Sequence, residues 1–126
     1  MKIYSHDTDE QITHKNNITE LNTWTNHLQY IDKEILNFNN LSLINQERYR
    51  ALGMIERLEK KRQQNLIQLQ NLEKYAEQLR LTVECEDVAC DMFFISSHEN
   101  YRKEYMHHLK AYRELKEDFF DKLMKK

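Results

Sequence analysis

The sequence predicts an all-α protein, an antiparallel bundle of three long helices of the coiled-coil type. Three observations support this prediction: proline is absent and glycine occurs once in 126 residues, 32% of the side chains are charged with both signs interspersed, and apolar residues recur at steps of three and four. Glycine and proline are the strongest breakers of regular structure, and tight β-hairpins need glycine or asparagine at positive φ. The length fits one domain.

The first helix is expected over about 17–38. Residues 1–16 are polar and have no clear period, so we predict a flexible N-terminal arm there and a single helical-bundle domain over 17–126. From residue 18 onward the apolar side chains alternate between steps of three and four, which indicates one buried helix face. The row is Leu21, Trp24, Leu28, Ile31, Ile35 and Phe38.

The second helix is expected over about 45–80, after a first turn between about 37 and 47. That turn is rich in asparagine, which tolerates turn conformations, and Ser42 is a candidate cap for the helix that follows. Gly53 falls inside this helix and costs roughly 1 kcal/mol relative to alanine, so we expect a kink or a close contact there. The apolar row is Leu52, Ile55, Leu58, Leu66, Leu69, Leu72, Ala76 and Leu79.

The last helix is expected over about 87–125, after a second turn near 80–86. Thr82 and Val83 are poor helix formers, whereas an acidic pair at 86–87 suits a helix N-terminus. A helix of this length must pack on something to be stable. Leftover apolar residues offer a surface for a dimer that would form a larger bundle; they are Phe93, Phe120 and Met124.

One face of the last helix is unusually polar. Two adjacent heptad rows place six side chains on it, and we call this set the polar seam: Asp91, His98, Tyr101, Tyr105, His108 and Tyr112. His107 points to a flank. Buried Tyr and His groups need hydrogen-bond partners, and the second helix offers four candidates: Glu59, Arg62, Asn65 and Glu73.

Antiparallel pairing about the second turn predicts which residues meet across the seam. His98 is expected near 68–69, and Tyr105 near 61–62, where it would meet Arg62 or Glu59. Asp91 is expected nearer Tyr75 and Ala76.

The seam has one structural interpretation and three chemical ones. The structural interpretation is a hydrogen-bonded layer that fixes helix register. A di-iron site needs two Glu-x-x-His pairs, and Glu104 with His107 supplies one. General acid–base chemistry by His98 or His108 is conceivable, but no nucleophile elbow, phosphate loop or cofactor fingerprint accompanies it. A zinc site would draw on residues that match no standard spacing; they are Cys85, Asp87, Cys90, Asp91 and His98.

The charge pattern and the composition indicate which partners and which cellular compartment to expect. The 19 basic and 21 acidic side chains are interspersed, whereas a nucleic-acid binder normally shows a basic excess or patch. No apolar run approaches the ~20 residues of a membrane span, and the start lacks the apolar segment of a secretory signal. On a helix Cys85 and Cys90 would lie about 140° apart, so a reduced, cytoplasmic setting is the simplest expectation.

Two segments also resemble a known group of proteins. "VECEDVACDMFFISSHENY", residues 83–101, and "LKAYRELKEDFFDKLMKK", residues 109–126, are similar to small uncharacterised all-α bacterial proteins. In that family an EC-x-D-x-x-CD stretch precedes an aromatic pair and a His-Glu step on a long C-terminal helix. "WTNHLQYIDKEILNF", residues 24–38, resembles the family's first helix. The family has no established activity, so the resemblance implies a cytosolic helical bundle and supplies no catalytic residues.

These patterns favour a non-enzymatic module for protein–protein interaction or scaffolding, with no cofactor and with a protein partner or a second copy as its ligand. The alternative is a metal- or redox-responsive bundle that uses Cys85, Cys90 and His98. A third hypothesis is a pH-sensitive seam, because histidine titrates near neutrality.

Overall fold

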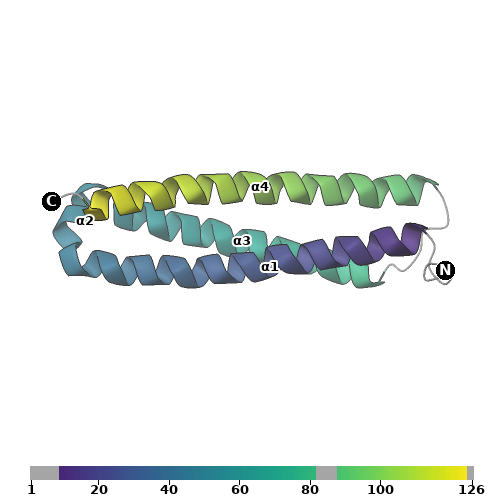
Figure 1. The fold of residues 1–126 in the computed structure, drawn as a ribbon, viewed down its shortest axis with the longest axis horizontal. Coiled ribbons are helices and arrows are strands. Elements are labelled where there is room, and N and C mark those ends of the chain that lie inside the picture. The colour runs from purple at the N-terminus through teal and green to yellow at the C-terminus, as the bar shows by residue number, and fades with distance from the viewer. Residues whose placement is uncertain (1–8, 82–87, 125–126) are drawn as a thin grey trace, which may run out of the picture.

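Three long helices lie side by side along the whole molecule (Figure 1). They are α1 (Asp9–Ser42), α3 (Met54–Leu81) and α4 (Val88–Met124). The computed structural model describes residues 9–81 and 88–124, with side chains for all of these except 9–12, 50–51, 81 and 88–91. Helix α3 runs antiparallel to the other two, so α4 runs parallel to α1. The predicted all-α bundle of three long helices is confirmed.

Helix α1 is longer than expected at both ends. Residues 9–16, which we predicted as part of a flexible arm, are its first turns, and its last turns continue past Phe38 to Ser42. No glycine or proline interrupts this stretch. Three of its threonines donate their hydroxyls to backbone carbonyls of the same helix, as where Thr19 Oγ1 donates to the Lys15 carbonyl at 3.0 Å. Residues 1–8 lie outside the described part of the chain.

The first connection is also later and longer than expected. It consists of a 3₁₀ turn, η2 (Leu43–Asn45), a short helix α2 (Gln46–Ala51) and the pair Leu52–Gly53. Gly53 has φ +68°, in the left-handed region that glycine adopts most readily. The prediction that Gly53 lies inside a helix was therefore wrong, because it is the turn residue that permits α3 to begin. The Ser42 hydroxyl donates to the Asn39 carbonyl at 2.7 Å and caps no helix.

The core follows the predicted row on α1 without exception. All six of those side chains are buried, from Leu21 to Phe38. On α3 the prediction is mixed. Leu58, Leu72, Ala76 and Leu79 are buried, but Leu52 is exposed in the turn, and Lys61 and Asn65 occupy core positions instead.

Helix α4 stands further from α1 than α3 does, because large side chains fill the space between the two parallel helices. The closest backbone packing is between α1 and α3. Between α1 and α4, Trp24 stacks on Tyr105 with ring centroids 5.2 Å apart, and Phe38 stacks on Phe119 at 4.8 Å. Across the described ranges, no helix is both long and apolar enough to span a bilayer.

Candidate functional site

Hydrogen-bonded pairs join α1 to the polar seam of α4 at regular intervals. We call each pair a rung: Glu20 with His98, His27 with Tyr105, and Glu34 with Tyr112. The two members of every rung are 78 residues apart in the sequence. Successive rungs are one heptad apart on both helices, so parallel helices of equal rise bring all three pairs together.

The first rung encloses a buried histidine. His98 is 2% exposed, and its Nε2 lies 2.7 Å from Glu20 Oε1 while its Nδ1 lies 2.8 Å from the Tyr75 hydroxyl. A carboxylate only accepts hydrogen bonds, so His98 Nε2–H donates to Glu20, and Nδ1 is hydrogen-bonded to the Tyr75 hydroxyl. Burial raises the pKa of Tyr75 to about 12, and this hydroxyl remains protonated at neutral pH.

A guanidinium closes the outer side of this rung. Arg102 donates to both oxygens of Glu20, from Nη2 at 2.6 Å and from Nε at 3.2 Å, and also pairs with Glu99. The hydrogen bond from Arg102 lowers the pKa of Glu20, and the bond from His98 adds to this effect against the cost of burial. Glu20 is therefore an anion that receives three N–H donors.

Aromatic rings pack tightly around His98. Trp24 stacks on it with centroids 5.1 Å apart, and the Arg102 guanidinium lies 5.9 Å from the centre of the same indole. Tyr101 stacks on Tyr75 at 4.3 Å. A substrate cannot reach His98 or Tyr75 without separating these rings, and this burial weighs against the acid–base interpretation.

The second rung lies one heptad further along. His27 Nδ1 is 2.6 Å from the Tyr105 hydroxyl. Burial lowers the pKa of His27, with a smaller contribution from the nearby Arg113, and burial raises the pKa of Tyr105. A neutral His27 ring that accepts a hydrogen bond from the Tyr105 hydroxyl is consistent with both pKa shifts.

The third rung repeats the form of the first, with a carboxylate held by an aromatic donor and a cation. Tyr112 donates to Glu34, and Lys116 Nζ lies 3.0 Å from the same carboxylate. Burial alone would raise the pKa of Glu34, but the bonds from Tyr112 and Lys116 outweigh it and the pKa lies below its usual value. Burial, followed by the Glu34 charge, raises the pKa of Tyr112 strongly.

A further network ties all three helices together. His108 Nε2–H donates to Asn65 Oδ1 at 2.9 Å, and Asn65 Nδ2 donates to the Leu28 carbonyl at 2.8 Å. Burial lowers the pKa of His108 to about 4, and the positive charge of Lys61 adds to the shift. His108 is therefore neutral at pH 7. Lys61, itself 7% exposed, is a core residue that the sequence analysis did not single out.

Five of the six polar-seam side chains can be placed. His98, Tyr105, His108 and Tyr112 are buried, and Tyr101 is half-buried. Asp91 lies on α4, but its side chain is outside the described set. His107 is exposed, as expected for a flanking position.

The predicted partners on α3 were mostly wrong. Of the four candidates, Asn65 is the one that bonds the seam in the described part of the chain. Arg62 pairs with Asp32 at 3.0 Å, Glu59 accepts from Gln63, and Glu73 is exposed. The partners that were missed are Tyr75 of α3, which bonds His98, and Glu20, His27 and Glu34 of α1. The heptad spacing of the three α1 residues beside the apolar row was the available signal.

The predicted pairing of α3 with α4 was wrong by one heptad. His98 meets Tyr75, not the expected 68–69, and His108 meets Asn65. Tyr105 bonds His27 rather than Arg62 or Glu59. A shift of seven residues presents the same faces, so heptad periodicity cannot distinguish the two registers.

The proposed metal ligands are largely outside the described residues. Cys85 and Asp87 fall in the undescribed segment, and Cys90 and Asp91 lie on α4 without described side chains. At His98 both ring nitrogens already have partners. Within 9–81 and 88–124, where side chains are described, no three His, Cys, Asp or Glu residues are grouped as metal ligands would be. The metal or redox hypothesis stays a prediction.

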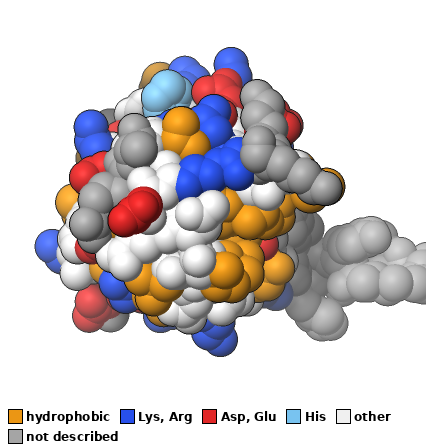
Figure 2. All heavy atoms as spheres, turned by 90° about the vertical axis from the view of Figure 1, so that its left-hand side faces the viewer, with side chains coloured by type: hydrophobic (Ala, Val, Ile, Leu, Met, Phe, Trp, Pro, Cys, Tyr) orange, Lys and Arg blue, Asp and Glu red, His pale blue; other side chains and the backbone are white. Residues whose placement is uncertain are grey.

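The second candidate site is a surface at the end of the bundle where α1 passes into α3 and α4 finishes. Figure 2 views this end and shows a broad hydrophobic area on its lower part, bordered by charged side chains. We call it the apolar end. Its exposed residues are Leu41, Leu43, Ile44, Leu52, Phe120, Leu123 and Met124.

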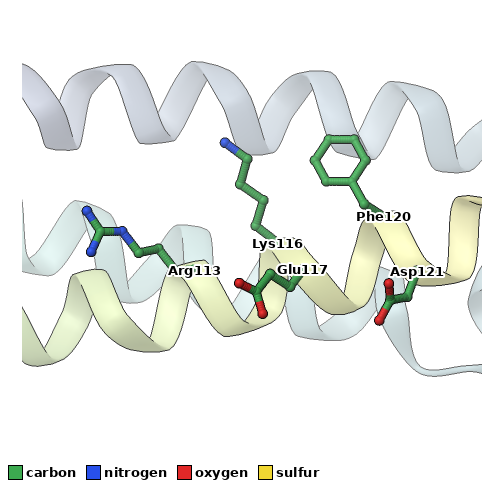
Figure 3. A pocket seen from close by; sticks show the side chains of 5 residues that line it. All are labelled: Arg113, Lys116, Glu117, Phe120 and Asp121. Carbon is green, nitrogen blue, oxygen red and sulfur yellow. The ribbon is translucent and has the colours of Figure 1, made fainter.

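An open depression of about 490 Å³ adjoins the apolar end on α4. Figure 3 shows Lys116 and Phe120 extending from α4 toward the neighbouring helix, while Glu117 and Asp121 stay beside α4. Lys116 is held by Glu34 and the Phe120 ring packs edge-on against Phe38 at 5.4 Å. The depression therefore has an apolar floor beside Phe120 and charged walls.

No family model, curated protein or solved structure matches this chain.

Proposed function

We propose that this chain is a non-enzymatic protein–protein interaction or scaffold module that docks through its apolar end. The observation that carries the proposal is the exposure of large apolar side chains there, with Ile44 at 82% and Met124 at 79%. Monomeric soluble proteins rarely expose a contiguous apolar patch above a few hundred Å², and larger ones mark interaction sites. The interspersed charges of the chain, net −2, support a protein as partner in the cytoplasm rather than a nucleic acid.

The polar seam supports the same proposal, because most of its described polar groups are hydrogen-bonded within the fold. Each ring nitrogen of His98 has a partner, and the hydroxyls of Tyr75, Tyr105 and Tyr112 are all bonded to other side chains. Such networks specify which surfaces meet and in which register. The bonded groups of the described side chains are held by neighbours rather than open to a substrate, which favours a structural role for the seam.

A matched pair of variants tests the proposal. Ile44→Asp places a charge in the apolar end, and Ile67→Asp makes the same change at an exposed position on α3, outside that surface. Tagged full-length wild type and both variants are used to isolate bound proteins from the native cell, with untagged copies of the chain counted as partners.

The expected result is a defined partner retained by wild type and by Ile67→Asp and lost with Ile44→Asp. The same set of bound proteins for all three chains would refute docking through the apolar end. Melting curves of the variants exclude loss of the fold as the cause.

A further inference from the structure

The apolar end is assembled from four parts of the chain that converge at one end of the bundle. Leu41 closes α1, Leu43 and Ile44 form η2, Leu52 precedes α3, and the last turns of α4 add three more side chains. Behind this surface Phe119 is fully buried, stacked on Phe38 and on Tyr49 with the latter centroid 5.4 Å away. The backbone that carries the exposed residues is therefore held in place from within, and the surface is preformed.

The charges around this surface are of both signs. Arg57 and Lys122 are both satisfied by Asp118. Glu47 and Arg48 on α2, and Asp121 on α4, have no ion-pair partner within the described residues. Glu47 and Arg48 are consecutive on α2 and project about 100° apart around that helix, so this end of the bundle carries an acid and a base on neighbouring faces of α2. A rim of this kind complements its own image, whereas a rim of one sign would repel it.

We propose that the occupant of the apolar end is a second copy of this chain, packed end to end about a two-fold axis. The inference rests on the proposed function and names its partner. In a two-fold interface the same patch meets itself, so residue i of one copy contacts residue j of the other and the reverse. In the proposed dimer Arg48 of each copy faces Glu47 of the other. Stable interfaces bury about 800 Å² per partner, and in this arrangement the apolar end forms the centre of the interface with the charged side chains around it.

Sedimentation velocity of the full-length protein over a wide range of concentration is the primary test. Wild type is expected to show a reversible monomer–dimer equilibrium. Ile44→Asp should raise the dissociation constant at least about 30-fold, as for a central interface residue, and Ile67→Asp should leave it within about twofold of wild type, since surface substitutions away from an interface change little. A wild type that is monomeric throughout, or a dimer that Ile67→Asp weakens as much as Ile44→Asp, would overturn the inference.

Charge exchange tests the two-fold arrangement itself. Glu47→Arg alone and Arg48→Glu alone each place like charges opposite one another and should weaken the dimer roughly three- to tenfold, as expected of rim charges. The double variant carries the same pair in exchanged order and should return to within about threefold of wild type by the same reasoning. A double variant weaker than either single variant would overturn the pairing.

Small-angle scattering distinguishes an end-to-end dimer from a side-by-side dimer. Helix α4 has 37 residues, which corresponds to a length of about 56 Å, so an end-to-end dimer should reach roughly 110 Å. A dimer no longer than the monomer would be side by side and would overturn the inference.

Three outcomes distinguish a failure of this inference from a failure of the proposed function. A monomer that captures a different protein, lost with Ile44→Asp and kept with Ile67→Asp, overturns the second copy as occupant and leaves the proposed function standing. A monomer whose bound proteins are the same for both variants refutes both. Retention of wild type, but not Ile44→Asp, on phosphatidylcholine vesicles would assign the surface to a membrane and also overturn the inference.

Discussion

The core between the first and third rungs and the core beneath the apolar end are built from different chemistry. In the first, Trp24 stacks on His98 and Tyr105. Hydrogen bonds also hold His98, Tyr105 and His108. In the second, Phe38 and Phe119 meet through ring faces alone, with Leu115 buried in the adjacent turn of α4. Both regions lie on the same two helices, so the difference comes from side chains rather than from the backbone.

This difference assigns two tasks to two regions: one region fixes the register of α4, and the other supplies the free energy of burial. A slip of α4 by one helical turn would leave the ring nitrogens and hydroxyls of the rungs buried without partners, and each such group costs about 1–3 kcal/mol. The same slip at the apolar end would bring Leu115 or Leu123 opposite Phe38 in place of Phe119, which exchanges one apolar contact for another. We infer that the rungs set the register of α4, while the apolar residues supply most of the burial energy and continue outward as a surface.

The largest expected effect is in the apolar half. Phe119→Ala removes a fully buried ring and should lower the free energy of unfolding by about 3–5 kcal/mol, measured by urea denaturation. Phe120→Ala, at a 40% exposed neighbour, should cost less than about 2 kcal/mol on the same grounds. Equal losses at the two positions would contradict the assignment of Phe119 to the core.

In the polar half, acid should weaken the fold through His108. Its pKa is about 4 in the folded chain against 6.5 for the free side chain, so the unfolded state takes up the proton first. Stability is therefore complete above pH 6.5 and is lost as the pH falls from about 6.5 to 4, by about 3 kcal/mol in total. Unfolding measured at a series of pH values provides the test.

Two histidine substitutions sharpen this test. His108→Gln should remove most of the loss between pH 6.5 and 4, whereas His107→Gln, at the exposed neighbour, should leave it in place. A stability that is flat over this range in wild type would show that His108 is not buried in its neutral form.

A smaller effect is expected at the residue that joins all three helices. Asn65→Leu keeps the branched shape of the side chain but leaves the His108 N–H without an acceptor, and should cost about 1–3 kcal/mol. Replacing both partners, as Asn65→Leu with His108→Phe, should recover much of this loss. Asn71→Leu on the exposed face of α3 is the control. A double variant that is weaker than the sum of its parts would contradict the pairing.

The smallest effect is expected at the surface of the first rung. Glu20 is about one-third exposed, and Glu20→Gln retains an oxygen that accepts from His98, so the loss should be about 0.5–1 kcal/mol. Glu99→Gln tests the other acid that Arg102 contacts and should change stability by less than about 0.5 kcal/mol by the same reasoning. A loss above 2 kcal/mol for Glu20→Gln would mean that this carboxylate, rather than the apolar half, holds α4 in place.

The candidate site was predictable on one side only. The polar seam of α4 followed from its own heptads, and five of its six side chains lie where that pattern placed them or, for Tyr101, half-buried at its edge. The partners of the seam could not be predicted from the sequence. Glu20, His27 and Glu34 look like ordinary solvent-facing residues of a helix unless α4 is known to run parallel to α1. Of the apolar end, the sequence analysis named Phe120 and Met124 as apolar residues available for a dimer. Leu43, Ile44 and Leu52 lie beside them only because of the way η2 and α2 fold.

The sequence alone determined the properties that repeat along a single helix: the all-α class, the buried row of α1 and the polar face of α4. These depend on neighbours three and four positions away. The tertiary structure decided what those faces meet. It extended α1 back to Asp9, placed Gly53 in a turn at φ +68° and set α3 one heptad from the expected register. Those outcomes depend on connection geometry and on hydrogen bonds between side chains 78 residues apart, which no local period contains.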